Sequence, residues 1–492
     1  MSAKSRSGIL YPFQPALVRY GLRAFGRTSP GRRFAASWYQ QRAERMAREL
    51  GALRGVQAVY LTGSSLRAPR LGYSDIDLIL AVDVPSLDDE LKLRHRLMQA
   101  LERHNRPFQL FQHIDYVEAG DLQFLARLGN AFALGLGDWS LMTGSDVRAP
   151  AVPISARHVE LARGAESLRH WVNQCGMLLE GWQRRHPSWS SHAVRRMLHS
   201  ALCLWLGTDK TWTLEGLLEL ARGRPCGPAL SLLCLEPGRW KRVNEPTFRV
   251  AVVLAAILEV LEAWVQQTFH EVGTWPACAE PARLEWVGQD DLGQACTALG
   301  FENVQMARRA PGSPQHVAFV TAPASMTSLV ALTRYEALIQ RMPALPEELF
   351  GKANYPILMT PTLFKALALV EPYPLVGASL ASGAVWTYPT HVKPSPAPAR
   401  EDLLTLITMA EVMLFWRPRG RSLRVLREGK ASLAALARDV LFVAPALSAL
   451  RDGSAHCSGT PGHDVKRNEA ELIGRLRDHL QTLRLELESK PT

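Results

Sequence analysis

The chain has 492 residues, 47% of them hydrophobic and 21% charged, and a formal net charge of +11. This length exceeds what one hydrophobic core usually serves and predicts two to four domains, while the composition excludes a chain that is mainly disordered. The seven cysteines form no C-x-x-C pair, which argues against a disulfide framework and favours a reducing, cytoplasmic location. The longest apolar run, Val250 to Leu258, stops at Glu259 and is too short for a transmembrane segment.

Positive charge is concentrated at the start of the chain. Between Met1 and Arg54 there are eleven Lys and Arg residues against two Glu residues, which accounts for +9 of the total charge of +11. Arg19, Arg23 and Arg27 recur every four residues and would share one helical stripe. Such a segment is typical of a solvated helix face, of contact with nucleic acid or an anionic membrane surface, or of an organellar transit peptide.

After a basic lead-in over residues 1–31, residues 32–150 predict an α/β domain with a mixed sheet and helices. The elements follow in the order helix, strand, strand, helix, strand, so the last three have the order strand, helix, strand. They span Arg32 to Leu53, Val56 to Thr62, Ser74 to Val82, Leu87 to His104 and Phe108 to Val117.

Two acids alternate with apolar residues at the start of the second predicted strand. Asp75 and Asp77 fall on one face of that strand, and Ile76 and Leu78 fall on the other. Two carboxylates so close repel each other unless a cation lies between them. Mg²⁺ prefers carboxylate oxygens and usually keeps substrate phosphate as a further ligand, so the pair is a candidate magnesium site.

Two further features extend this pattern. A turn at Gly63 and Ser64 offers backbone N–H groups and a hydroxyl to phosphate oxygens, and Asp115 is a lone carboxylate in a later strand. A Gly-Ser turn, then Asp-x-Asp, then a third Asp on a later strand is the signature of the DNA polymerase β-like nucleotidyltransferase superfamily. The stretch from about residue 55 to 150 resembles that superfamily, and its form GSSLRAPRLGYSDIDL looks most like the small-molecule and minimal nucleotidyltransferases.

The resemblance implies a role for each of these residues. Asp75 and Asp77 would bridge two Mg²⁺ ions about 3.5–4 Å apart, or Mn²⁺ in their place, and Asp115 would complete the site nearest the acceptor. Gly63 and Ser64 would hold the β- and γ-phosphates of an NTP, with ATP favoured. The predicted site residues are Asp75, Asp77 and Asp115 for catalysis and metal binding, and Gly63, Ser64, Ser65 and Arg67 for the nucleotide.

The expected activity is transfer of a nucleoside monophosphate from an NTP to a hydroxyl acceptor, with release of pyrophosphate. A small molecule is the favoured acceptor, and an RNA or tRNA end, a protein side chain and cyclic or oligonucleotide synthesis are alternatives. The general base is open among Asp115, Glu118, Glu160 and Glu166. Outside enzymes, the alternatives are a non-catalytic nucleotide-binding or antitoxin-like scaffold and a purely structural role for the two acids.

The rest of the chain predicts mainly helical domains, so the expected fold class is α+β overall. Residues 151–275 predict a helical bundle, 276–325 a small α/β unit, and 326–492 a mainly helical region with a proline-rich linker near 389–400. The spacing of Arg163 to His170 and of Arg185 to His192 is also compatible with a HEPN-type nuclease motif.

Overall fold

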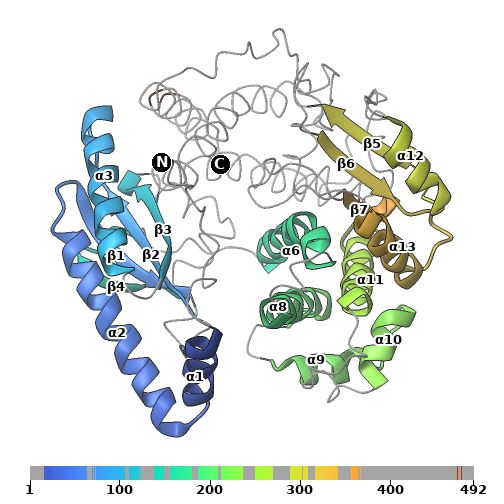
Figure 1. The fold of residues 1–492 in the computed structure, drawn as a ribbon, viewed down its shortest axis with the longest axis horizontal. Helices are drawn as coiled ribbons and strands as arrows, with labels where there is room; N and C mark the ends of the chain where they lie inside the picture. The colour runs from blue at the N-terminus through green and yellow to red at the C-terminus, as the bar shows by residue number, and fades with distance from the viewer. Residues whose placement is uncertain are drawn as a thin grey trace. The chain divides into compact units, whose positions relative to one another are not determined.

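The computed structural model describes part of the chain, and its described elements are drawn in Figure 1. It describes residues 16–63, 69, 71, 74–105, 110–120, 122, 138–148, 156–179, 187–208, 212–235, 250–269, 289–301, 303–308, 316–341, 356–363, 366, 474 and 478. The chain divides into two compact units. The first comprises Met1–Pro153, Val412–Val443 and Asp464–Thr492, and the second Ile154–Glu411 and Ala444–His463.

The first unit holds a mixed four-stranded sheet in the order β3-β2-β1-β4. Its strands are β1 (Val56–Thr62), β2 (Ile76–Val82), β3 (Phe111–Glu118) and β4 (Ser140–Gly144). β1 is antiparallel to both of its neighbours, whereas β2 and β3 are parallel and are joined through helix α3 (Leu87–His104). The predicted mixed sheet with helices and its strand, helix, strand order are confirmed, and β1 and α3 match their predicted bounds residue for residue.

Helices α1 (Ala16–Gly26) and α2 (Ser29–Gly51) precede the sheet. α2 begins where the Thr28 side chain accepts a hydrogen bond of 3.0 Å from the Gly31 backbone N–H, with a proline in its first turn. α2 and α3 bury their apolar sides against the same face of the sheet (Figure 1). The shared core includes Tyr39, Met46 and Leu50 of α2, Leu93 and Leu97 of α3, and Leu61, Ile76, Leu78 and Leu80 of the sheet.

A polar contact fixes α2 to α3 at their ends. The Glu49 carboxylate accepts hydrogen bonds from Arg103 and from the buried His104, the latter with a distance of 2.7 Å between His104 Nε2 and Glu49 Oε2. The hydrogen bond from Arg103 is the main cause that lowers the pKa of Glu49 below its ordinary value of 4.5, and His104 adds to it against the opposing effect of burial. The charged form of Glu49 is therefore the one that stabilises this contact.

We expect the Glu49→Gln variant to lose stability in a pH-dependent way. Because the folded pKa of Glu49 is depressed, its contribution is present above about pH 4.5 and is lost as the pH falls through the folded pKa. The expected loss at pH 7 is about 1 kcal/mol, since Glu49 and Arg103 are partly exposed and solvent screens them. Hydrogen exchange of the α2 and α3 amides at pH 7 and pH 4 measures it.

The matched control is Glu44→Gln, because Glu44 is an exposed acid in the middle of α2 and glutamine keeps the oxygen that accepts the hydrogen bond from Gln40. This control is expected to leave amide protection in α2 and α3 unchanged at both pH values. Equal protection in wild type and Glu49→Gln at pH 7 would contradict the role given to Glu49.

The second unit combines a helical bundle with a three-stranded sheet of order β5-β6-β7. The helices are α6 (Ala156–Leu179), α8 (Pro187–Leu206), α9 (Leu214–Ala221), α10 (Pro228–Leu235), α11 (Val250–Phe269), α12 (Gln289–Ala298) and α13 (Ser328–Arg341). The strands are β5 (Asn303–Arg308), β6 (His316–Thr321) and β7 (Ile357–Met359). β7, which comes from the predicted region 326–492, pairs with β6 in parallel. The α+β class of the chain is confirmed, with helix as the larger part.

Helix α11 is the core of this unit. Its Trp264 ring packs so closely on α6 that a Cβ atom on Gly164 would lie 2.0 Å from it, and the indole N–H donates to Glu160 over 3.1 Å. The Glu259 carboxylate accepts the backbone N–H groups of Ala229 and Leu230 at the start of α10. The stretch Val250–Thr268 is long and apolar enough to cross a membrane, but 67% of it is buried inside the unit, as core helices also are.

Candidate functional site

Three carboxylates share one face of the sheet in the first unit. Thr62 on β1 lies opposite Asp77 on β2, and Ile79 on β2 lies opposite Asp115 on β3. Residues two apart on a strand point to the same side, so Asp75, Asp77 and Ile79 share a face. The pairing register places Thr62 and Asp115 on the same face as Asp77 and Ile79. We call this face of the sheet the acid face.

The other face of the sheet is the core described above. Ile76 and Leu78, which alternate with the acids, are at most 1% exposed, whereas Asp75, Asp77 and Asp115 are half-buried. The alternation therefore separates polar from apolar residues as the sequence predicted. One detail differs: β2 begins at Ile76, so Asp75 directly precedes the strand.

Gly63 lies directly against the carboxylate of Asp77. It ends β1 with φ of +79°, a conformation that L side chains rarely adopt. A Cβ atom at this position would lie 2.4 Å from Asp77 Oδ2, which is closer than atoms can pack, and 3.3 Å from Asp77 Cγ. Only glycine therefore allows both this turn and this placement of the Asp77 carboxylate.

The backbone on both sides of Asp75 is held by hydrogen bonds. The hydroxyl of Tyr39, a buried residue of α2, donates to the carbonyl oxygen of Ser74 over 2.6 Å. On the other side, the Ile76 N–H donates to the carbonyl oxygen of Leu110 over 2.8 Å. These two hydrogen bonds fix the path of the backbone on either side of Asp75. Tyr39 therefore acts as a positioning residue for the Asp75 side chain.

We expect Tyr39→Phe to destabilise the first unit by about 1–3 kcal/mol, because it removes a bond to a buried carbonyl. Any nucleotidyl transfer should also fall, since the segment carrying Asp75 loses an anchor. Hydrogen exchange and a transfer assay measure the two effects. The matched control is Tyr335→Phe in the second unit, whose buried hydroxyl donates to the Pro356 carbonyl. It should lose stability but keep transfer, and equal transfer by both variants would contradict the positioning role.

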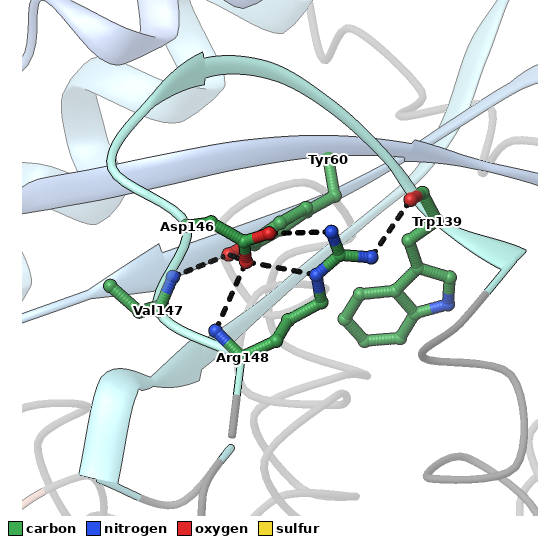
Figure 2. A network of polar contacts seen from close by, with 5 residues as sticks. All are labelled: Tyr60, Trp139, Asp146, Val147 and Arg148. Atoms are coloured by element: carbon green, nitrogen blue, oxygen red, sulfur yellow. Dashed lines mark hydrogen bonds and ion pairs between the residues drawn. The ribbon is translucent and has the colours of Figure 1, made fainter. Parts of the chain in front are cut away.

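A polar network joins Tyr60 of β1 to the chain that follows β4 (Figure 2). Tyr60 lies opposite Ile79 and so shares the acid face. Its hydroxyl lies 3.0 Å from Asp146 Oδ1 and accepts the Val147 N–H over 2.9 Å. Arg148 donates to both oxygens of Asp146 and, over 2.9 Å, to the Trp139 carbonyl oxygen. Its guanidinium carbon stands 5.2 Å from the centre of the Tyr60 ring.

This network excludes Asp146 from the candidate chemistry. Hydrogen bonds from Arg148 hold the pKa of Asp146 well below its ordinary value of 3.8, so the carboxylate stays ionised. Both of its oxygens already accept from Arg148, and one of them faces Tyr60. Asp146 therefore fixes the chain after β4 to β1 rather than serving as a free acid.

The predicted nucleotide-binding and base residues fall in different places. Ser64, Ser65 and Arg67 lie outside the residues that the structure describes. Glu118 is three residues beyond Asp115 on β3, so strand alternation places it on the opposite face. This separation leaves Asp115 as the acid of β3 that shares a face with Asp77.

The two base candidates of the second unit have partners there. Glu160 accepts from Trp264 and Thr268 of α11, and Glu166 lies 3.6 Å from His170 Nε2. Arg163 is seven residues before His170 on the same helix, while Arg185 lies outside the described residues. The contact with Glu166 gives His170 a partner on its own helix, and the nuclease spacing stays a prediction.

The donor set fits a hard divalent cation only in part. Within the ranges that the structure describes, no group of three or more His, Cys, Asp or Glu side chains could hold a metal ion by itself. Mg²⁺, however, is commonly bound through one or two carboxylates together with the phosphates of a substrate. Asp75 and Asp77 meet that requirement, because Asp77 lies against the glycine turn and alternation places Asp75 on the same face.

Sequence reasoning missed Tyr39, Thr62 and the Tyr60 network. Thr62 could have been found, because it directly precedes the glycine turn and its strand was predicted. Tyr39 lies 35 residues before Ser74, and no sequence signal connects them. Comparisons of the whole chain with protein-family models, with curated proteins and with solved structures find no match.

Proposed function

We propose that the acid face is the catalytic site of a metal-dependent nucleotidyltransferase. The observation that carries this proposal is the contact between Gly63 and Asp77, which joins the Gly-Ser turn to the Asp-x-Asp pair in space. The shared face of Asp115 supports it further. A purely structural role for the acids explains neither the glycine at this position nor the three carboxylates on one face.

Each residue contributes to the transfer in a defined way. Asp75 and Asp77 supply negative oxygens that hold a nucleotide-bound Mg²⁺ or Mn²⁺, and the turn at Gly63 offers backbone N–H groups to phosphate oxygens. When bound, the cation balances charge on the transferring phosphoryl group and on the leaving pyrophosphate. Asp115 lies on β3, the strand next to β2, and can accept the proton of an acceptor hydroxyl. The products are a nucleotidylated acceptor and pyrophosphate.

The acceptor is assigned by class only. A small hydroxyl compound is favoured by the form of the turn, and an RNA end or a protein side chain suits the same phosphoryl chemistry. ATP is the favoured donor, and the expected cellular location is cytoplasmic. This proposal includes the assignment of residues 32–150 as a nucleotidyltransferase domain.

The test compares ATP labelled at the α-phosphorus with ATP labelled at the γ-phosphorus. The full-length protein is incubated with each nucleotide, Mg²⁺ and cell extract, and small molecules, RNA and protein are then separated. Compared with a reaction that contains Asp77→Asn in place of wild type, additional label from the α-position in one fraction, with no additional label from the γ-position, is expected and also names the acceptor class. Label only from the γ-position would mean phosphoryl transfer and would overturn the proposal.

A non-catalytic nucleotide-binding or antitoxin-like scaffold is the second candidate. It is favoured by the lack of a ready-made three-residue metal cluster among the described residues. Binding of ATP without any labelled product, with all four NTPs and with Mn²⁺ as well as Mg²⁺, would support this scaffold in place of the enzyme.

A further inference from the structure

A row of aromatic and basic residues runs along the outer face of α2. Phe34, Trp38, Gln41, Arg45 and Arg48 recur at the spacing of a single helical face. Trp38 lies at the edge of this face, because it is partly buried and packs against the core, and the other four are exposed. From the first to the last of them the helix rises about 21 Å. We call this row the α2 stripe.

The aromatic end of the stripe has two exposed rings, Phe25 of α1 and Phe34, next to the partly buried ring of Trp38. Phe25 of α1 and Phe34 are 44% and 49% exposed, and their ring centres are 6.0 Å apart. Phe34 and Trp38 follow at 6.3 Å with planes only 15° apart. The rings therefore form a platform on which a further flat group can stack.

The other end of the stripe carries two exposed arginines on a helix that has more Arg than Glu residues. Arg45 and Arg48 are exposed, and neither makes an ion pair with a carboxylate among the described residues. The two acids of α2 are engaged elsewhere: Glu44 accepts from Gln40, and Glu49 accepts from α3.

We propose that the α2 stripe binds single-stranded RNA. Unpaired bases stack on the rings of Phe25 and Phe34, and the phosphates that follow bind Arg45 and Arg48. Single-stranded ends and loops are the parts of RNA that expose their bases for such stacking. A membrane is the weaker partner, because helices that lie on membranes separate apolar and basic residues onto different faces, whereas here both lie on one face.

The aromatic end of the stripe lies near the segment that leads to the acid face. A Cβ atom on Gly26, next to Phe25, would lie 3.1 Å from the Cβ atom of Leu71. Leu71 belongs to the connection between Gly63 and Asp75 and is buried in the same core. Binding of RNA to the stripe does not depend on the transfer chemistry.

The test measures fluorescence anisotropy of a labelled, unstructured 12-nucleotide RNA with the full-length protein. Phe34→Ala is expected to weaken binding by about 5- to 100-fold. Arg45→Gln/Arg48→Gln should weaken it at least about tenfold and flatten its salt dependence, because two phosphate contacts are lost. The matched control is Lys92→Gln/Arg96→Gln, which removes two exposed positive charges from α3 and should leave affinity unchanged.

Three outcomes would overturn the proposal. They are equal RNA affinity in wild type and both stripe variants, tighter binding of DNA of the same sequence, and binding of phosphatidylserine vesicles but not of RNA. Asp77→Asn is expected to keep full RNA affinity. The experiments can therefore distinguish an error in the proposed transfer activity from an error in the proposed RNA binding by the stripe. Circular dichroism of each variant verifies that these exposed substitutions leave the fold intact.

Discussion

Replacing Asp77 by Asn is expected to reduce metal-dependent nucleotidyl transfer by about 10³-fold or more while the fold remains intact. Asn keeps the size of the side chain but removes the negative charge that holds a nucleotide-bound cation. The side chain is half-buried on the acid face, away from the packed core, so the change creates no cavity. Asp75→Asn should give a loss of the same order, and the double variant little more, because the two acids act on one cation.

The matched control for charge is Asp88→Asn, which removes one exposed carboxylate from the same unit. It should transfer nucleotide at the wild-type rate, and hydrogen exchange should show the same amide protection in all of these variants. Wild-type transfer by Asp77→Asn in the presence of Mg²⁺ would contradict the role given to this acid.

Gly63→Ala is expected to reduce transfer by about 100-fold, although it adds only a methyl group. The added Cβ atom would stand 2.4 Å from Asp77 Oδ2, so the carboxylate must move by about 1 Å to reach normal contact distance. A shift of that size at a reacting centre costs about two orders of magnitude in rate. The positive φ of +79° adds a backbone strain of about 1–2 kcal/mol.

The strain and the contact can be separated with a second glycine. Gly207 has φ of +67°, but a Cβ atom there would meet nothing within 4 Å. Gly207→Ala should therefore lose a similar amount of stability and keep full transfer. If Gly63→Ala and Gly207→Ala lost activity equally, the contact with Asp77 would have no catalytic meaning.

Much of the first unit could be predicted from local sequence signals. The run VQAVYLT is mainly apolar and contains β-branched residues, and it forms β1 with the predicted first and last residues. The helix at Leu87 begins after Ser86, whose side chain accepts the Asp89 N–H, and its first turn is rich in acids. Such signals act within a few residues, which is why the bounds of these elements were predictable.

Contacts between distant residues could not be predicted in the same way. The register that sets Asp115 opposite Ile79 depends on how two strands pair across a crossover, and a single strand does not encode it. The anchor from Tyr39 and the link between Tyr60 and Asp146 join residues far apart in the chain. Glu118 and Asp115, by contrast, are three residues apart on one strand. Because successive residues of a strand alternate between its two faces, their placement on opposite faces could be predicted from the sequence.

Binding of metal and nucleotide at the acid face can be tested by titrating the full-length protein with Mn²⁺ in the presence of a non-hydrolysable ATP analogue. Electron paramagnetic resonance then measures how much Mn²⁺ is bound. We expect nucleotide-dependent Mn²⁺ binding in wild type and in Asp88→Asn, and its loss in Asp75→Asn and Asp77→Asn. Undiminished Mn²⁺ binding in the last two variants would contradict the account, because the acid face would then not be where the metal and nucleotide bind.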